Sequence, residues 1–400
     1  MNSKTFKDMK RKEVNSSRMP VYRDAGFELY DALTTENAFR KETEHNREPD
    51  LYIYSRYRNP TVVSAEEEIM KLEGSGWALL TQSGMSAIDT ALSVFQHGKA
   101  KRPWMFFTEI YGGTISFVDS VLKSRRGLDI QYFAPENQEY DLVKFENEIV
   151  ALKPEIVYIE TISNPMLIVS DVRNIIAIAK KYGTNVIIDN TFSTPWLCNP
   201  LADGADIVIH SATKYFSGHG NLTAGVLCGN DNKIMQSAIE YRKFVGHALS
   251  PDDAYRLQTQ IQSFELRFSR QCSNASKLAE YLDRQPVIKT VWFPGLKNHP
   301  THSIAEKLFG NKGFGAMITF DFDGKNKTEK RNRRDKFIEL VSEKIKLIPT
   351  LGDPHTILMP VEAVWGAKYP EPGMIRLSVG FEDYLGLEGT ISKALQTIKG

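Results

Sequence analysis

The sequence predicts an α/β protein: a mainly parallel seven-stranded sheet covered by helices, followed by a smaller C-terminal α/β domain. Several short apolar runs are bounded by turn residues, which is typical of strands buried on both faces of a parallel sheet. Segments of helical length separate most of these runs, and such alternation favours helices on both faces of the sheet. A chain of 400 residues is also long for one core, so we expect two domains with appendages.

The strands are expected, in chain order, at Ala78–Leu80, Trp104–Phe107, Ile130–Phe133, Ile156–Glu160, Val186–Ile188, Ile207–Ile209 and Ala224–Cys228. Helical segments between them are expected at Gly113–Leu122, Asp141–Leu152 and Asp171–Tyr182. Before the first strand, the pattern predicts a helix from about Val62 to Leu72. Thr61 is its expected N-cap, acidic residues 66–68 lie near its positive end, and Gly74 ends it.

We expect three parts along the chain. Residues 1–62 are poor in apolar residues and are predicted to form an arm rather than a domain. Residues 63–253 contain all seven strands expected for the large sheet, and residues 254–400 form the C-terminal domain. A long helical pattern from Ser250 to Leu282 is expected to link the two domains. In the second domain, strands are expected at Ala316–Phe322 and Met374–Val379, separated by a charged solvated helix start or loop at 325–336.

Composition excludes several classes of function. The 50 basic and 49 acidic residues nearly balance, so neither nucleic acid nor an anionic membrane is an expected partner. The chain has no apolar run long enough to span a membrane, and its N-terminus lacks the apolar centre of a signal peptide. The three cysteines show no metal-ligand spacing and no disulfide framework, so no metal is expected. A cytoplasmic location follows as the prediction.

Polar side chains follow two of the buried strands at their carboxyl ends, where ligands collect in open α/β sheets. Asp189 follows one strand, and Ser211, Thr213 and Lys214 follow the next. A pyridoxal phosphate site needs a lysine for the Schiff base, an acid to hold the pyridine nitrogen protonated, and hydroxyls for the phosphate. An isolated Asp and Lys beside ordinary strands would more often be structural. The run Ser211–Lys214, followed by Gly218, His219 and Gly220, favours the cofactor site.

Two strings carry a resemblance to a known family. Residues 187–191 read IIDNT, and residues 211–220 read SATKYFSGHG. They resemble the VVVDNT-like and SATK…SGHG runs of the cystathionine/methionine-metabolism family of pyridoxal phosphate (PLP) enzymes. The resemblance covers about residues 50–390. It implies the aspartate aminotransferase-like fold (fold type I of PLP-dependent transferases) and PLP as the cofactor.

The resemblance also implies an assembly. Tyr54 and Arg56 lie in a Y-x-R element like the one whose tyrosine and arginine bind the cofactor phosphate of the neighbouring subunit in this family. An arginine suits this role because its planar fork can donate two parallel hydrogen bonds to a phosphate. We therefore expect a homodimer with shared active sites, assembled into a homotetramer.

Further site residues follow from the same resemblance. The backbone amides of Gly84 and Met85, in a turn that leads into a helix, are expected to bind the phosphate. Tyr111 is expected to stack on the cofactor ring and to exchange a proton at the leaving group. Asn164 matches the asparagine that hydrogen-bonds the phenolic oxygen of the cofactor.

The substrate is expected to meet residues of the C-terminal domain. Arg376 interrupts a strand of buried type, and a buried cation needs an anion. Its IRLSVG run resembles the one whose arginine binds the substrate α-carboxylate. Thr350 stands where the family has a serine that orients the lysine and the substrate. Met359 stands near the place of a glutamate in cystathionine-cleaving members, so the distal end of the pocket is expected to be apolar.

These residues predict a PLP-dependent lyase for a small amino-acid substrate. After the substrate displaces Lys214, the lysine moves protons between Cα, the cofactor and Cβ, so that a group on Cγ leaves. γ-Elimination of a sulfur-containing or γ-substituted amino acid, as in methionine and cystathionine γ-lyases, is the first hypothesis. γ-Replacement on an O-acylhomoserine is the alternative, β-elimination is the third, and a binding protein without turnover is the remaining one.

Two departures from the family pattern bear on the substrate. Gly113 stands where methionine γ-lyases mostly have a cysteine, and residues 361–373 are unlike the usual histidine-containing loop. Because an apolar pocket would bind a second ammonium poorly, cystathionine is expected to be a worse substrate than methionine, homocysteine or an O-acylhomoserine. A glutamate at position 359 would then shift preference towards cystathionine.

Overall fold

The computed structural model of the chain describes residues 18–96 and 102–399. Its large sheet has seven strands in the order β1-β7-β6-β5-β4-β2-β3. Their bounds are β1 Trp77–Thr81, β2 Trp104–Phe107, β3 Ile130–Phe133, β4 Ile156–Glu160, β5 Asn185–Asp189, β6 Ile207–His210 and β7 Gly225–Gly229. All seven predicted strands are present. Only β7 runs antiparallel to its neighbours, so the sheet is mainly parallel as expected.

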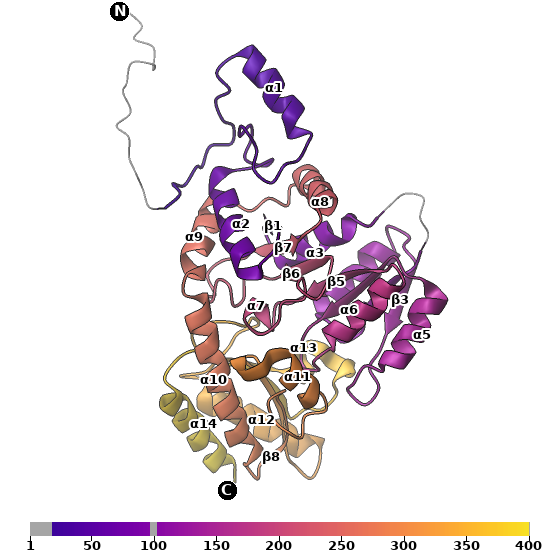
Figure 1. The fold of residues 1–400 in the computed structure, drawn as a ribbon. Helices are drawn as coiled ribbons and strands as arrows, with labels where there is room; N and C mark the ends of the chain where they lie inside the picture. Colours follow the sequence, from indigo (N-terminus) through magenta and orange to yellow (C-terminus); the bar gives the residue numbers. More distant parts are fainter. Residues whose placement is uncertain (1–17, 97–101, 400) are drawn as a thin grey trace, which may run out of the picture.

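Burial on both faces of the sheet explains why the sequences of these strands are continuous apolar runs. Every residue of β1, β2, β4, β6 and β7 is buried, because helices cover both faces of the sheet (Figure 1). Strand β3 lies at the edge and is buried only at its two ends. The helices of this part are α3 Gly84–Ser93, α4 Gly112–Phe117, α5 Leu142–Leu152, α6 Val172–Lys181, α7 Thr194–Leu197 and α8 Asn232–Val245, with a π-helical turn at Val118–Lys123 that continues α4.

The three predicted helical segments between strands are present as α4 with its π-helical turn, α5 and α6. The last two begin one residue later than expected, because Asp141 and Asp171 are their N-caps. The Asp141 side chain accepts hydrogen bonds from the backbone N–H groups of Val143 and Lys144, and that of Asp171 accepts one from Asn174.

Helix α2 (Pro60–Glu73) confirms the predicted helix but corrects its N-cap. The Asn59 side chain accepts a hydrogen bond from the Thr61 N–H at 2.9 Å, and Pro60 fills the first helical position. The Thr61 hydroxyl instead binds the arm, accepting from Tyr22 N at 2.9 Å and donating to Pro20 O at 2.8 Å. The helix starts two residues earlier than expected, so its acidic residues lie outside the first turn.

The predicted long linking helix is divided into α9 (Pro251–Ile261) and α10 (Phe264–Asp283). Helix α10 runs from the large sheet towards the C-terminal sheet (Figure 1). Phe264 and Phe268 of its first half belong to the large core, whereas Leu278 and Leu282 of its second half belong to the core of the C-terminal sheet. One helix therefore holds the two sheets in a common frame.

The second sheet has the order β10-β11-β12-β9-β8 and is antiparallel except between β10 and β11. Its strands are β8 Ile288–Trp292, β9 Met317–Phe322, β10 Lys346–Leu347, β11 Ile357–Pro360 and β12 Met374–Ser378. Strands β9 and β12 were predicted, and the other three were not. Its helices and 3₁₀ turns are α11 His302–Phe309, η3 Gly310–Lys312, α12 Lys327–Val341, α13 Val361–Trp365, η4 Gly366–Lys368 and α14 Tyr384–Lys399. The charged run 325–336 is thus the start of α12.

The part of the arm that the structure describes before α2 contains one helix, α1 (Ala32–Glu42), and lies beside α8 at the top of Figure 1. An ion pair of 2.6 Å joins Lys243 of α8 to Glu42 of α1. The first 17 residues of the predicted arm lie outside the described residues. The division of the chain at residues 62 and 253 stays a prediction. Among the described residues, no helix is long and apolar enough to cross a membrane.

Candidate active site

The site lies at the edge of the large sheet where four parallel strands end. Strands β4, β5 and β6 end at Glu160, Asp189 and His210, and β1 ends on the same edge because β1 and β6 are both antiparallel to β7. A pocket opens here between the two sheets. Of the predicted site residues, those that line it are Gly84, Met85, Tyr111, Asn164, Asp189, Ser211, Thr213, Lys214, Thr350 and Arg376.

Lys214 lies in the turns that follow β6, with its amine in the pocket. The Nζ atom donates a hydrogen bond to Thr350 Oγ1 at 2.8 Å. Burial, assisted by the positive charge of Arg376, lowers the pKa of Lys214 to about 8. Gly352 has a φ of +83°, and a Cβ there would lie 2.8 Å from the Lys214 carbonyl carbon. A glycine at this position therefore lets the turn with Thr350 lie directly on the Lys214 backbone.

Asp189 lies on the floor of the pocket and is 9% exposed. Its Oδ1 accepts from the N–H of Thr191 at 3.0 Å and from its hydroxyl at 2.6 Å. Its Oδ2 has one weak donor, the Tyr158 hydroxyl at 3.4 Å. Burial raises the pKa of Asp189, because the loss of hydration outweighs the hydrogen bonds from Thr191 and the nearby His210. A protonated ring nitrogen is the kind of partner that would complete this site.

The start of helix α3 forms an anion cradle. Ser83 is the N-cap, and its Oγ accepts from Ser86 N at 3.1 Å, which leaves the Gly84 and Met85 amides in the first turn without helical partners. The Ser211 hydroxyl lies against this turn, since a Cβ on Gly84 would be 3.1 Å from its oxygen. Thr213 lines the same pocket, but its hydroxyl already donates to Ala224 O and accepts from Ala224 N. Of the two hydroxyls, that of Ser211 is better placed for a phosphate.

Arg376 approaches the pocket from the opposite wall, in the middle of the second sheet. Its guanidinium donates to Asn164 Oδ1 at 3.1 Å and to the Thr350 carbonyl at 3.0 Å, both neutral acceptors. Its Nε has no partner, and none of the ion pairs found within the described ranges involves Arg376. Burial lowers the pKa of Arg376 to about 10. A buried cation without a counter-ion calls for an anionic ligand.

Tyr111 lies at the mouth of the pocket with 50% of its surface exposed. Its backbone N–H donates to Glu160 Oε1 at 2.6 Å. A Cβ on Gly113 would lie 2.3 Å from Tyr111 Cε1, so the ring occupies the space that a side chain at 113 would take. A cysteine in place of Gly113 would therefore do more than add a thiol, because any side chain at position 113 would displace the Tyr111 ring.

Sequence reasoning did not assign a role to several residues that line the pocket: Ser83, Ile88, Glu160, Ile162, Thr191, Phe192, Thr223, Pro349 and Leu351. Glu160 had a visible signal, because it ends a buried strand in the same way as Asp189. The two are register partners on β4 and β5. Burial and the nearby Asp189 charge raise the pKa of Glu160 well above its usual range.

Three predicted site residues do not line this pocket. Arg56 donates to the Lys243 carbonyl at 2.7 Å, and its guanidinium lies 5.4 Å from the centre of the Tyr54 ring. Tyr54 is 41% exposed. Met359 is buried on β11 as the register partner of Arg376 and is absent from the pocket lining.

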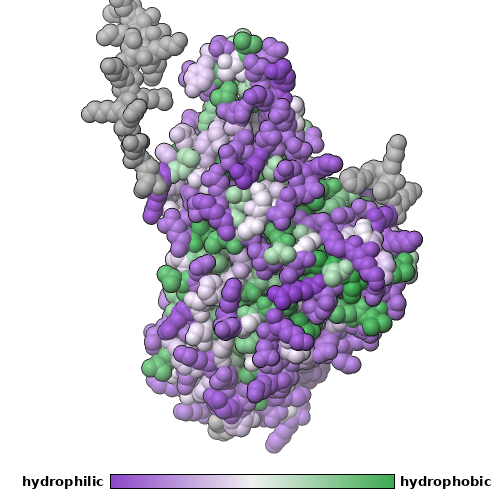
Figure 2. All heavy atoms as spheres, in the orientation of Figure 1, coloured by the Kyte–Doolittle hydropathy of each residue, from purple (hydrophilic) through white to green (hydrophobic). Residues whose placement is uncertain are grey.

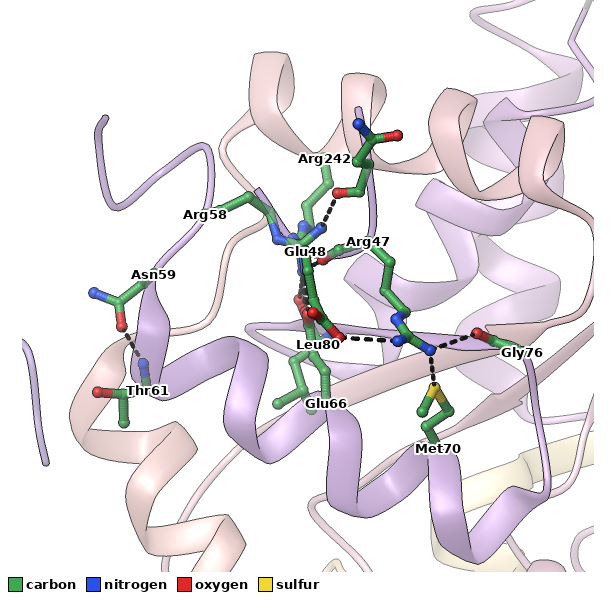
Figure 3. A network of polar contacts seen from close by, with 11 residues as sticks. Arg47, Glu48, Arg58, Asn59, Thr61, Glu66, Met70, Gly76, Leu80 and Arg242 are labelled. Atoms are coloured by element: carbon green, nitrogen blue, oxygen red, sulfur yellow. Dashed lines mark hydrogen bonds and ion pairs between the residues drawn. The ribbon is translucent and has the colours of Figure 1, made fainter. Parts of the chain in front are cut away.

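A buried charge network holds the 54–58 element against the large sheet (Figure 3). Glu66 of α2 accepts from Arg242 Nη1 at 2.6 Å and from Arg58 Nη2 at 3.2 Å. Its Oε1 also accepts from Leu80 N at 2.9 Å, and Arg242 donates to the Leu80 carbonyl at 2.8 Å. The network thus connects the arm, α2, α8 and the strand that leads into the anion cradle.

These residues fit PLP. The α3 amides and Ser211 form a phosphate site, and Asp189 is a buried carboxylate suited to a cationic partner. The pKa of the Lys214 amine is lowered to about 8, so that the free amine is accessible near neutral pH. Within the described part of the chain, no group of three or more His, Cys, Asp or Glu side chains is arranged to hold a metal ion. The fold and the site together define a PLP-dependent enzyme.

Comparison with known proteins gives the family. The model of the family described as Cys/Met metabolism PLP-dependent enzyme matches residues 4–396. A cystathionine β-lyase of Lactococcus lactis subsp. cremoris is 34% identical over 358 residues, covering 87% of this chain and 90% of the relative. An L-methionine γ-lyase of Porphyromonas gingivalis is 32% identical over 392 residues, covering 95% and 92%. The chain belongs to the Cys/Met metabolism family of PLP-dependent enzymes.

The solved structures agree with this assignment. The crystal structure of a cystathionine γ-synthase from Xanthomonas oryzae pv. oryzae matches with a TM-score of 0.82 at 26% identity, covering 95% of this chain and 93% of that one. The predicted fold class, the family and the PLP cofactor are thereby confirmed.

Proposed function

We propose that the enzyme catalyses γ-elimination on a sulfur-containing or γ-substituted amino acid, giving a 2-oxoacid, ammonia and a thiol. One observation carries the proposal: Arg376, a buried cation without a counter-ion, lies in the same pocket as the amine of Lys214. This pair matches the carboxylate and the α-carbon of an amino acid. The similarity to an L-methionine γ-lyase over 95% of this chain supports the γ-position of the leaving group.

The side chains divide the work. PLP, when bound, supplies an electron sink for the charge that develops on Cα. Arg376 binds and orients the substrate carboxylate, while Asn164 and the Thr350 carbonyl hold its guanidinium. Lys214 takes the proton from Cα, and the Thr350 hydroxyl orients its Nζ. Asp189 keeps the ring nitrogen protonated, and Tyr111 passes a proton to the group that leaves from Cγ.

γ-Replacement on an O-acylhomoserine is the second candidate. The match to a cystathionine γ-synthase over 95% of this chain supports it. Elimination and replacement use the same residues, because both begin with loss of the Cα proton and of the group on Cγ and differ in whether a new nucleophile then bonds to Cγ. The cystathionine β-lyase relative makes β-elimination a further outcome for the test.

We also propose that the active unit is a homodimer with shared sites, within a homotetramer. Tyr54 and Arg56 lie outside the pocket of their own chain and belong to the arm. Large apolar side chains are exposed on the arm and the end of α8: Tyr30, Leu33, Phe39 and Phe244. Figure 2 shows hydrophobic patches on the surface over the middle and right of this face.

The three cysteines are buried and unbridged, which supports a cytoplasmic location.

A substrate panel tests the proposal. Methionine, homocysteine, cystathionine and O-acylhomoserines are each scored for 2-oxoacid and released thiol, with and without an added thiol. γ-Elimination predicts 2-oxobutyrate from methionine without any added thiol, whereas a new thioether only in the presence of thiol indicates replacement. Pyruvate from cystathionine would contradict both. Borohydride reduction should place the cofactor label on the Lys214 peptide, and a label on another lysine would contradict the site.

A further inference from the structure

The segment 361–369, which connects β11 to β12, crosses behind the pocket from one wall to the other. It consists of helix α13, the 3₁₀ turn η4 and Tyr369. Its sequence belongs to residues 361–373, which are unlike the usual histidine-containing loop of the family. Two contacts, one near the middle and one at the end, relate it to the site.

The first contact is made by Trp365. The Arg376 guanidinium carbon lies 5.4 Å from the centre of the Trp365 ring, which is within the range of a cation–π interaction. The Arg376 Nη atoms are engaged by Asn164 and Thr350, so the indole adds a third constraint on the guanidinium plane. Trp365 is itself held by a cluster of buried apolar residues: Met166, Ile168, Val361 and Met374.

The second contact fixes the far end of the segment. Lys368 Nζ lies 3.0 Å from Glu109 Oε1 and donates to the Thr108 carbonyl at 2.8 Å. The Tyr369 hydroxyl donates to Glu109 Oε2. Glu109 stands two residues before Tyr111, in the loop that carries it to the mouth of the pocket. The segment therefore spans from the Arg376 wall to the Tyr111 wall.

We propose that Trp365 is a positioning residue for recognition of the substrate carboxylate. Its ring fixes the plane of the Arg376 guanidinium, and the anchoring at Glu109 keeps the ring in place. Orientation matters because an arginine binds a carboxylate with two parallel hydrogen bonds only when the two planes are aligned. The inference rests on the proposed function, since it requires Arg376 to bind the α-carboxylate.

The test compares two small ligands that differ in the carboxylate. Glycine and methylamine are titrated into the holoenzyme, and their Kd values are measured from the absorbance of the bound cofactor. Trp365→Leu, which keeps apolar bulk but removes the ring, should raise the Kd of glycine about three- to thirty-fold. The Kd of methylamine should change less than about twofold, because this ligand makes no contact with Arg376. Trp365→Phe should restore most of the glycine affinity.

Controls separate the possible failures. Trp292 packs against the same apolar cluster but donates its indole N–H to Gln138, so Trp292→Leu should leave both Kd values unchanged. Arg376→Leu tests the proposed function: if it leaves glycine binding intact, the carboxylate role of Arg376 and the inference fail together. If Arg376→Leu weakens glycine binding and Trp365→Leu does not, or weakens both ligands equally, the inference alone is overturned. A Trp365→Phe variant as weak as Trp365→Leu would also overturn it.

Discussion

Lys214 shows how the surroundings of one residue prepare it for chemistry. Its amine is taken out of water, lies near the cation of Arg376 and donates to a neutral hydroxyl. Burial and then the charge of Arg376 disfavour the ammonium form, and they outweigh the opposite effect of Asp353, so the pKa of Lys214 falls to about 8. A deprotonated amine is the form that attacks a carbonyl and that accepts a proton from Cα.

The pH dependence of Lys214 labelling checks this in the cofactor-free protein. Only the free amine reacts with an acylating reagent, so labelling of the Lys214 peptide should rise with pH and level off above about 8. Exposed lysines should continue to gain reactivity up to about pH 10.4. Mass spectrometry of the labelled peptides measures both in one sample. Arg376→Leu should move the Lys214 midpoint upwards, and a parent midpoint near that of exposed lysines would contradict the argument.

At the scale of elements, the register between β11 and β12 changes the role expected for Met359. Met359 and Arg376 are direct partners in an antiparallel pair, so their side chains project from the same face of the sheet. Met359 is 8% exposed and does not line the pocket. A carboxylate at 359 would therefore meet Arg376 before it met the distal amino group of a substrate.

This register reverses the outcome expected from sequence for Met359→Glu. We now expect the new carboxylate to pair with Arg376 and to compete with the substrate carboxylate. The KM of methionine and of cystathionine should both rise by about tenfold or more, because a charge-assisted hydrogen bond is worth about 1.5–3 kcal/mol. Met359→Gln, of similar shape and without charge, is the control. A selective gain in kcat/KM for cystathionine would favour the original hypothesis instead.

In helix α2, the buried Glu66 holds distant segments of the chain together through ion pairs. Glu66 is buried between Arg58 and Arg242, and removal of its charge would leave two buried cations without their partner. Glu66→Gln should lower the free energy of unfolding by about 3–5 kcal/mol. Glu68→Gln, on the same helix, breaks only an exposed pair with Lys71 and should cost less than about 1 kcal/mol. Denaturant unfolding of the cofactor-free variants measures both, and equal effects would refute the role of the network.

At the scale of the whole molecule, no residue of the described part of the arm lines the pocket of its own chain. Arg56 is held by the end of α8, whereas Lys214 and Arg376 face the space between the two sheets. If the arm completes the pocket of a second copy, each site combines residues of two chains. Cofactor retention would then depend on assembly.

Subunit mixing tests this arrangement. Arg56→Ala and Lys214→Ala should each be inactive or nearly so, and co-refolding them should recover activity. Random pairing into two-fold dimers places one intact site in half of the dimers, so at most about a quarter of the parental activity is expected. Each variant refolded alone is the control. Demonstrated mixed dimers without activity would show that Arg56 serves its own subunit.

The sequence by itself determined the sheet and the chemical parts of the site. The seven strands were predictable because burial on both faces leaves a continuous apolar run, and Asp189 and Lys214 were visible because they interrupt that pattern at strand ends. No comparable local signal marked the short strands at 346–347 and 357–360 or the break between α9 and α10. Thr61 was predicted as the N-cap of α2, whereas the N-cap is Asn59, two residues earlier. The strands and the helix break depend on contacts between distant segments, whereas the N-cap Asn59 is a local feature, followed directly by Pro60 at the first helical position.

Only the tertiary structure decided how the parts work together. It showed that Arg376 has no counter-ion among the described residues, that the Thr350 hydroxyl accepts a hydrogen bond from the lysine and that Glu160 lies beside Asp189. It also placed Trp365 on the guanidinium plane. Periodicity reports which face of an element is buried, whereas the partner that a buried charge finds there is set by packing between segments hundreds of residues apart. For this reason the family could be predicted from strings of residues, and the geometry that selects a substrate could not.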